Sequence, residues 1–225
     1  MRKIYSAVQM MFFSVALSAI GSVITNIESL SSLGSFMTMG GGIMTIVALY
    51  SLRFENRYFS KSLRLFWISV GLVIGLSILG GVAIASVTSQ ESTALAMAGS
   101  VIIIIVSIAL LVIEIMMQYQ LYAGFDEMRG ARAFDYPAKR IMWCFYLAII
   151  SMIVSFAAVI GMMPSLLSVI STGELASSSE QMLEIISNIV LVANVLIEAI
   201  HLWLIFTYMQ SAREALENEE MSGWN

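Results

Sequence analysis

The 225-residue chain is too apolar for an ordinary soluble domain. Apolar residues make up 59% of it and charged residues 12%, whereas soluble globular proteins carry about 25% charged residues. The formal charge is −4 at neutral pH, and no basic patch with interleaved aromatic residues lies outside the short connections, so no nucleic-acid partner is predicted. The single cysteine, Cys144, excludes an intramolecular disulfide and a cysteine-based metal cluster.

Six apolar stretches follow one another along the chain. Each can cross a bilayer as a helix, because the apolar core of a bilayer is about 30 Å thick and a helix rises about 1.5 Å per residue. The first stretch is longer than the apolar region of a signal peptide, so we expect it to be retained. The second contains Gly40, Gly41 and Gly42 in a row, which membrane helices tolerate better than soluble ones. The predicted helices are 4–25, 33–52, 65–86, 98–122, 141–163 and 185–208.

All Lys and Arg residues lie on one side of this six-helix arrangement. The connections that contain them alternate with connections in which glutamates are the only charged residues. Short loops rich in Lys and Arg remain in the cytoplasm. The pattern therefore predicts a multi-pass protein of the inner (plasma) membrane with both termini in the cytoplasm. The basic residues are Arg2, Lys3, Arg53, Arg57, Lys61, Arg64, Arg129, Arg132, Lys139, Arg140 and Arg213.

A weak repeat divides the chain into three helical hairpins. In the first helix of each hairpin, a basic residue is followed sixteen positions later by Ser and three positions after that by a small residue. We predict an all-α, polytopic bundle that forms a single membrane domain, 1–225, with hairpins at about 1–58, 59–134 and 135–225 that arise from a tandem repeat. Chance matches between apolar helices are the alternative. The three sets are Arg2, Ser18 and Gly21; Lys61, Ser77 and Gly80; and Lys139, Ser155 and Ala158.

The connections are predicted to be only partly helical. The segment 123–140 and the short cytoplasmic tail 210–225 should extend the helices before them, since the tail has the charged faces of a solvated helix. The longest connection, 164–184, should hold a short helix after Pro164 and a flexible stretch at 177–179. Aromatic residues near the basic helix ends, Tyr122 and Tyr208 among them, are typical of the interfacial belt.

Small residues recur at four-residue spacing in several of the predicted helices. Such ridges let helix backbones approach closely in lipid. We expect them to pack inside the bundle, and the alternative is that they bind a second copy of the chain or a membrane partner protein. The ridges are Ser14, Ser18 and Ser22; Gly71 and Gly75; Ser77 and Gly81; and Ser151 and Ser155.

Two glutamates inside predicted membrane helices, Glu114 and Glu198, are the main candidates for function. An ionisable side chain at that depth costs on the order of 3 kcal/mol, so it normally faces protein or water. Polar residues at helical spacing place further side chains on the same face of each helix. We predict that the two glutamates bind a proton or an ion. The predicted pathway-lining residues are Ser107, Gln118, Asn188, Asn194 and His201.

The same residues also allow a purely structural interpretation. Glu198 and His201 lie one turn apart and could satisfy each other, with Asn194 and Gln118 completing a buried network between helices. The spacing of Glu198 and His201 also occurs in di-iron bundles, but those need two such motifs and two further glutamates. Only one motif is present, so no metal or other cofactor is predicted.

The function predicted from the sequence is that of a small channel or secondary carrier for an ion, proton or small solute. The paired intramembrane carboxylates would form its working centre, and the lipid bilayer would surround it. An enzyme is not predicted, because the chain has no phosphate loop, no Gly-x-Ser-x-Gly elbow and no His-Glu-x-x-His pair. The alternative is a non-transporting membrane scaffold or accessory subunit that acts through helix packing with a partner.

Overall fold

The computed structural model describes residues 2–25, 28–88, 93–172 and 177–222. Within these ranges, side chains are described except at 28, 79–88, 93–101, 103–104, 159–160, 162–172, 177–180, 182–183 and 222. The described chain is all-α and contains no strand. Its elements are α1 (Arg2–Thr25), the short 3-10 helix η1 (Glu28–Leu30), α2 (Ser31–Leu52), α3 (Arg57–Thr88), α4 (Thr93–Ala131), α5 (Met142–Thr172) and α6 (Ser177–Ser222).

The six predicted helices are all present, and most extend beyond their predicted bounds. Five contain stretches long and apolar enough to cross a membrane, and α5 has a shorter apolar stretch, Met142–Ala158, among its described residues. This architecture is consistent with a multi-pass membrane protein. The tandem repeat, the single-domain organisation and the insertion into a membrane remain predictions. The five stretches are Arg2–Thr25, Ser31–Leu52, Arg57–Ile78, Ile105–Ala131 and Glu184–Met221.

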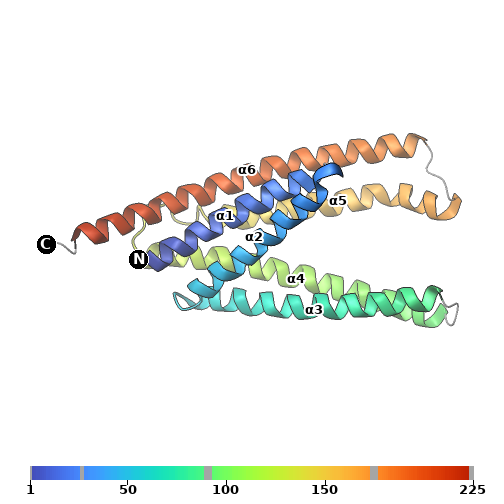
Figure 1. Cartoon of the computed structure of the whole chain (residues 1–225), viewed down its shortest axis with the longest axis horizontal. Helices are drawn as coiled ribbons and strands as arrows, with labels where there is room; N and C mark the ends of the chain where they lie inside the picture. Colours follow the sequence, from blue (N-terminus) through green and yellow to red (C-terminus); the bar gives the residue numbers. More distant parts are fainter. Residues whose placement is uncertain (1, 26–27, 89–92, 173–176, 223–225) are drawn as a thin grey trace.

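The helices run alternately in opposite directions. The N-terminus, the 53–56 turn, the 132–141 connector and the C-terminus therefore lie toward the same end of the molecule (Figure 1). The eleven Lys and Arg residues belong to these segments or to the helical turns nearest to them. We call this the basic end and the opposite one the far end.

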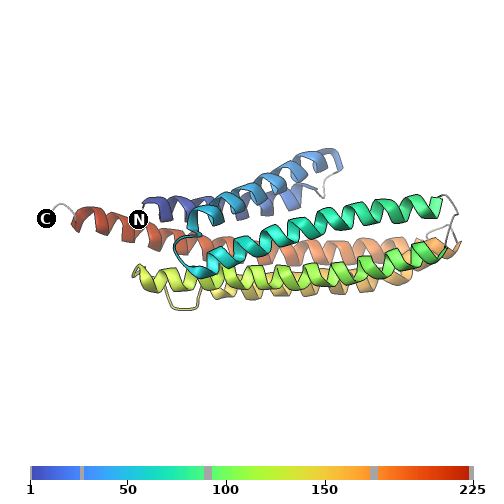
Figure 2. The same ribbon diagram turned by 90° about the horizontal axis from the view of Figure 1, so that it is seen from below.

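The three helical hairpins pack against one another at the basic end and diverge toward the far end. Each helix packs on its neighbours in sequence, and α6 also packs on α1. The tightest pairs are the three hairpins α1–α2, α3–α4 and α5–α6. The α3–α4 hairpin and the α1–α2 hairpin approach each other near the 53–56 turn and diverge beyond it, as two perpendicular views show (Figures 1 and 2).

The hydrophobic core lies at the basic end. Its largest fully buried side chains include Tyr208 of α6 and Phe59 of α3. The Tyr208 ring contacts Phe125, Phe134 and Tyr136, with ring centroids 5.2–5.7 Å apart. We call Phe59, Tyr122, Phe125, Phe134, Tyr136 and Tyr208 the aromatic core.

The α1–α2 hairpin is also tightly packed, because small residues bring its two backbones together. A Cβ atom added at Gly21 would lie 2.7 Å from the backbone oxygen of Gly34, so only glycine fits there. The hydroxyl of buried Ser14 donates a hydrogen bond of 2.7 Å to the backbone oxygen of Gly41 and also contacts the Thr45 hydroxyl. Packing by the predicted ridge is confirmed at Ser14.

Several expectations about small and loop residues are wrong. The pair Gly71 and Gly75 does not pack inside the bundle, because a Cβ atom at either position would meet nothing within 4 Å among the described residues. The 177–179 stretch is not a loop but the first turn of α6. Likewise, α5 continues as one helix past Pro164. The predicted helical extension over 123–140 is confirmed only as far as Ala131 and is wrong beyond it, because 132–141 forms a non-helical connector. The predicted helical tail is confirmed over 210–222.

Candidate ionisable site between α4 and α6

A short chain of polar side chains joins α6 to α4 beside the aromatic core. On α6, a carboxylate oxygen of Glu198 lies 3.5 Å from Nδ1 of His201, one turn further along the helix. The other ring nitrogen of His201, Nε2, lies 2.6 Å from the hydroxyl of Tyr122 on α4. The two ring nitrogens of His201 thus connect a carboxylate of α6 to a phenol of α4.

Glu114 lies on α4, two turns from Tyr122 toward the far end. Its carboxylate accepts a hydrogen bond of 2.8 Å from the side-chain amide of Gln118. Glu114, Gln118 and Tyr122 follow one another at four-residue steps, so they share one face of α4. The two acids are thus held on two different helices and have no direct bond to each other among the described contacts.

The two predicted acids are only partly buried. The Glu198 side chain is 37% exposed and that of His201 is 13% exposed, and Glu114 has intermediate burial. Glu198 lines a groove of about 290 Å³ between α1 and α6 whose other lining residues are almost all apolar. Glu198 therefore has one protein partner and also faces an open groove.

The remaining predicted residues fall into two groups. Asn194 lies one turn before Glu198 on α6, and its side-chain oxygen accepts a hydrogen bond of 3.0 Å from the Ser151 hydroxyl of α5 rather than bonding to either acid among the described contacts. It also lines a second groove, of about 200 Å³, among α1, α5 and α6. Asn188 and Ser107 are exposed side chains closer to the far end and contact neither acid among the described interactions.

Tyr122 is a site residue that the sequence pattern assigns only to the interfacial belt. It is 2% exposed, and its hydroxyl is the group that connects α4 to His201. One signal was available: Tyr122 continues the polar four-residue series of Glu114 and Gln118. That series identifies a face of α4, but the partner helix cannot be read from it.

The aromatic core closes the basic end beneath the site. The Tyr208 hydroxyl donates a hydrogen bond of 2.7 Å to the backbone oxygen of Phe125, and the Tyr136 hydroxyl donates one of 3.2 Å to the backbone oxygen of Leu204. These bonds tie α6 to α4 and to the connector. Burial raises the pKa of Tyr136 above its ordinary value, so its hydroxyl keeps its proton and remains a donor.

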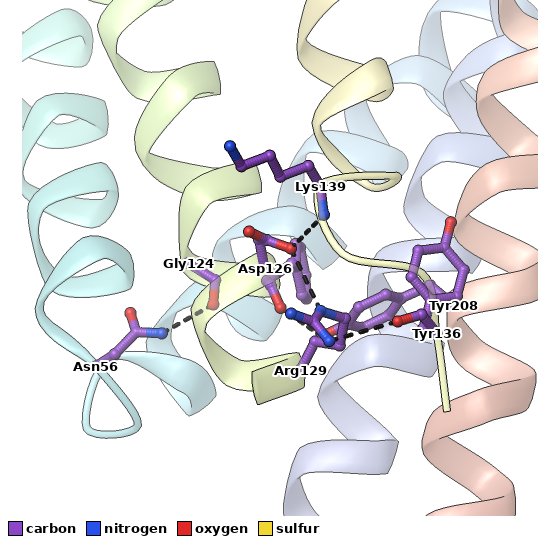
Figure 3. Close-up of polar contacts among 8 residues, drawn as sticks. Asn56, Gly124, Asp126, Arg129, Tyr136, Lys139 and Tyr208 are labelled. Atoms are coloured by element: carbon purple, nitrogen blue, oxygen red, sulfur yellow. Dashed lines mark hydrogen bonds and ion pairs between the residues drawn. The ribbon is translucent and has the colours of Figure 1, made fainter. Parts of the chain in front are cut away.

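The 132–141 connector is held against the end of α4 and against the 204–211 part of α6. Asp126 accepts a hydrogen bond of 2.8 Å from the backbone N–H of Lys139, and it lies 3.4 Å from the guanidinium of Arg129, as drawn in Figure 3. Lys139 has a φ of 59°, a left-handed conformation that is uncommon for a residue with a side chain. The bond to Asp126 holds that conformation.

No group of three or more His, Cys, Asp or Glu side chains comes together as a metal site within the part of the chain that the structure describes. In comparisons with known proteins, no protein-family model, no curated protein and no solved structure matches the chain. The candidate site therefore has to be interpreted from its own residues.

Proposed function

We propose that the protein is a multi-pass integral membrane protein whose basic end faces the cytoplasm. The apolar helices support insertion in a bilayer. The position of all Lys and Arg residues at one end supports the orientation. In this arrangement both termini are cytoplasmic, and the far end faces the outside of the inner (plasma) membrane.

Within that membrane the protein acts as a small secondary carrier or channel for a proton, an ion or a small solute. The observation that carries this proposal is the Glu198–His201–Tyr122 chain, which joins α6 to α4 where the packed core ends. Glu198 and Glu114 bind the proton or cation, and His201 exchanges a proton with Glu198. Gln118 orients the Glu114 carboxylate, Asn194 lines the neighbouring groove, and Asn188 and Ser107 lie along the route toward the far end.

The packing of the helices suits a carrier or channel whose pathway is closed at the basic end. The aromatic core closes the basic end, while the helices diverge beyond the site (Figure 1). Protonation of Glu198 or His201 changes the strength of their pairing, and therefore the contact that His201 makes with Tyr122. Because this contact joins α4 to α6, its loss would favour separation of the two helices at the basic end. That separation would expose the site to the cytoplasm.

Flux through proteoliposomes tests the proposal. The purified chain is reconstituted, a proton gradient or an ion gradient is imposed, and internal pH or ion content is followed with time. Glu198→Gln and Glu114→Gln should bring the flux down to that of empty liposomes, because the amide retains the shape and loses the titratable group. Glu217→Gln, in the exposed tail, is the matched control and should keep the flux. Wild-type flux equal to that of empty liposomes over a panel of ions, solutes and pH gradients would contradict transport.

Tyr122→Phe tests whether the contact between His201 and Tyr122 takes part in transport. It keeps a ring in the aromatic core and removes only the hydroxyl that contacts His201. If the His201–Tyr122 contact takes part in transport, the pH at which flux is half-maximal should shift. An unchanged pH profile would contradict a role for this contact, even where Glu198→Gln abolishes flux.

A non-transporting accessory subunit is the second candidate. The observation that favours it is the glycine pair Gly71 and Gly75 on α3, where an added Cβ atom would meet nothing within 4 Å among the described residues. A ridge of this kind allows a second helix to approach closely. Under this function, Gly71→Leu would release a membrane protein that co-purifies with the chain, while Glu198→Gln would retain it.

A further inference from the structure

Two cavities lie in series along the seam between α4 and α5. The one at the basic end has a volume of about 610 Å³ and is lined by polar and aromatic residues of α3, α4, the connector and α5. We call it the headgroup crevice. The next one toward the far end has a volume of about 520 Å³ and is lined by largely apolar residues of α4 and α5. We call it the acyl groove.

Both cavities are lined by residues of α4 and α5. Glu127, Ala123 and Tyr119 line the headgroup crevice, and Ile115 and Leu111 line the acyl groove, all at four-residue steps. Sixteen residues separate Glu127 from Leu111, which is about 24 Å of helix. One leaflet of a bilayer, with its headgroups, is about 20–22 Å thick. The seam therefore has the length of one lipid molecule in the leaflet at the basic end.

The headgroup crevice holds separated charges of both signs. Glu127 is exposed, and neither its carboxylate nor the Lys139 ammonium forms an ion pair among the described residues. Asp126 uses its carboxylate on the Lys139 backbone and on Arg129, while the Lys139 side chain extends away from it (Figure 3). The crevice thus offers one unpaired cation, one unpaired anion and a second carboxylate.

Aromatic rings form the wall between these charges and the acyl groove. Trp143 and Tyr146 of α5 line the headgroup crevice together with Tyr119 of α4, and Tyr119 packs edge-on against Phe145 with ring centroids 5.6 Å apart. Trp and Tyr are the residues that occupy the interface between headgroups and acyl chains. Their rings can also contact the cationic part of a ligand.

We infer that the α4–α5 seam binds a phospholipid with an ethanolamine headgroup. The Lys139 ammonium contacts the lipid phosphate, Glu127 accepts a hydrogen bond from the primary ammonium, and one acyl chain lies in the acyl groove. A choline headgroup carries the same charge but has no N–H to donate, so it cannot satisfy the Glu127 carboxylate. This inference rests on the membrane placement proposed above and does not depend on transport.

Lipid retention by the purified full-length chain tests the inference. The protein in detergent is mixed with phosphatidylethanolamine, phosphatidylcholine or phosphatidylglycerol of identical acyl chains, and the bound fraction of each is measured by native mass spectrometry. Phosphatidylethanolamine should be retained about tenfold more tightly than phosphatidylcholine, the effect of one charge-assisted hydrogen bond. This comparison needs no variant, so no folding defect can affect it.

Variants locate the binding to the seam. Glu127→Gln should remove the preference for ethanolamine over choline, and Lys139→Met should weaken retention of both lipids. The matched controls are Glu214→Gln in the exposed tail and Lys61→Met on the exposed first turns of α3, and both should behave as the wild type does. Glu198→Gln should abolish flux and leave lipid retention unchanged, so the two proposals fail independently.

Three outcomes would overturn the inference. The first is equal retention of the ethanolamine and choline lipids by the wild type. The second is an ethanolamine preference that persists in Glu127→Gln. The third is a preference for phosphatidylglycerol over phosphatidylethanolamine that disappears in Lys139→Met, which would identify a site for anionic lipid instead.

Discussion

The basic end of the molecule and the layer that contains Glu114 and Glu198 differ in the burial of their side chains and in the number of their polar partners. At the basic end, aromatic rings from α3, α4, α6 and the connector bury one another, and the Tyr208 and Tyr136 hydroxyls bond to backbone oxygens. In the next layer, Glu114 and Glu198 each have one polar partner and remain partly exposed. The first region has the packing of a structural core, whereas the second keeps ionisable groups accessible.

This difference separates residues that hold the fold from residues that are free to perform chemistry. A packed core gains stability from many contacts and tolerates little change in volume. A half-exposed carboxylate with a single partner adds little to stability, because such pairs contribute about 1 kcal/mol or less. Substitutions at the basic end should therefore act on folding, and substitutions in the layer above it should act on function.

The largest effect on stability is expected at Phe59. Its side chain is fully buried against Phe125 and Gly124, so Phe59→Ala should lower the free energy of unfolding by about 3–5 kcal/mol. Phe36 of α2 is 72% exposed, and Phe36→Ala should change the free energy of unfolding by no more than about 0.5 kcal/mol. Unfolding in mixed micelles with increasing SDS, followed by circular dichroism, measures both. Equal losses would show that packing is not concentrated at the basic end.

Two adjacent glycines of α2 offer the next contrast. A Cβ atom at Gly41 would lie 2.7 Å from the backbone oxygen of Ser14, whereas one at Gly42 would meet nothing within 4 Å. Gly41→Ala should therefore cost about 1–3 kcal/mol through overpacking. Gly42→Ala should stabilise the helix by up to about 1 kcal/mol. The same SDS titration compares them, and effects of the same sign would contradict the close approach of α1 and α2.

A smaller effect is expected at Tyr136 in the connector. Tyr136→Phe removes the hydrogen bond to the backbone oxygen of Leu204, which also accepts from the Thr207 hydroxyl. The loss should be about 0.5–1.5 kcal/mol at neutral pH. A thermal or SDS unfolding curve at pH 7 gives this value.

The pH dependence of the same variant has a defined sign. Burial raises the pKa of Tyr136, so the folded state holds this proton more tightly than the unfolded state does. Its contribution is fully present below the ordinary tyrosine pKa of about 10 and is lost as the pH rises through the higher folded value. The advantage of the wild type over Tyr136→Phe should therefore shrink above about pH 10. A constant difference up to pH 12 would contradict burial of this hydroxyl.

The helices themselves could be predicted from the sequence, because each is an apolar run of membrane-spanning length. The alternation of basic and glutamate-containing connections also predicted that the basic residues gather at one end, as the helix order confirms. Helix ends were less accurate. The predicted start of α3 at residue 65 is eight residues late, since the helix begins at Arg57. The charged residues of its first turns hide a helical segment from any search for apolar runs.

The partners of the candidate residues were harder to predict. The spacing of Glu198 and His201 was enough to expect their contact, because residues three apart meet on a helix. The contact of His201 with Tyr122 depends on which helices lie side by side, and helical periodicity carries no such information. The small-residue ridges show the same limit of a sequence pattern. Ser14 and Gly71 belong to similar patterns, yet the first is buried against α2 and the second faces open space.

The central claim is that the layer around Glu198 is reached from the far end while the basic end is closed. Val195 lies one turn from Glu198 and is 41% exposed. It lines the two grooves of about 290 Å³ and 200 Å³ described above. Val195→Cys therefore places a thiol beside Glu198. The native Cys144 is fully buried and serves as the unreactive control. A membrane-impermeant maleimide added to intact cells should label the Val195→Cys protein from the outside and leave the wild type unlabelled. Labelling only from the cytoplasmic side, or only after the membrane is dissolved in detergent, would contradict the account.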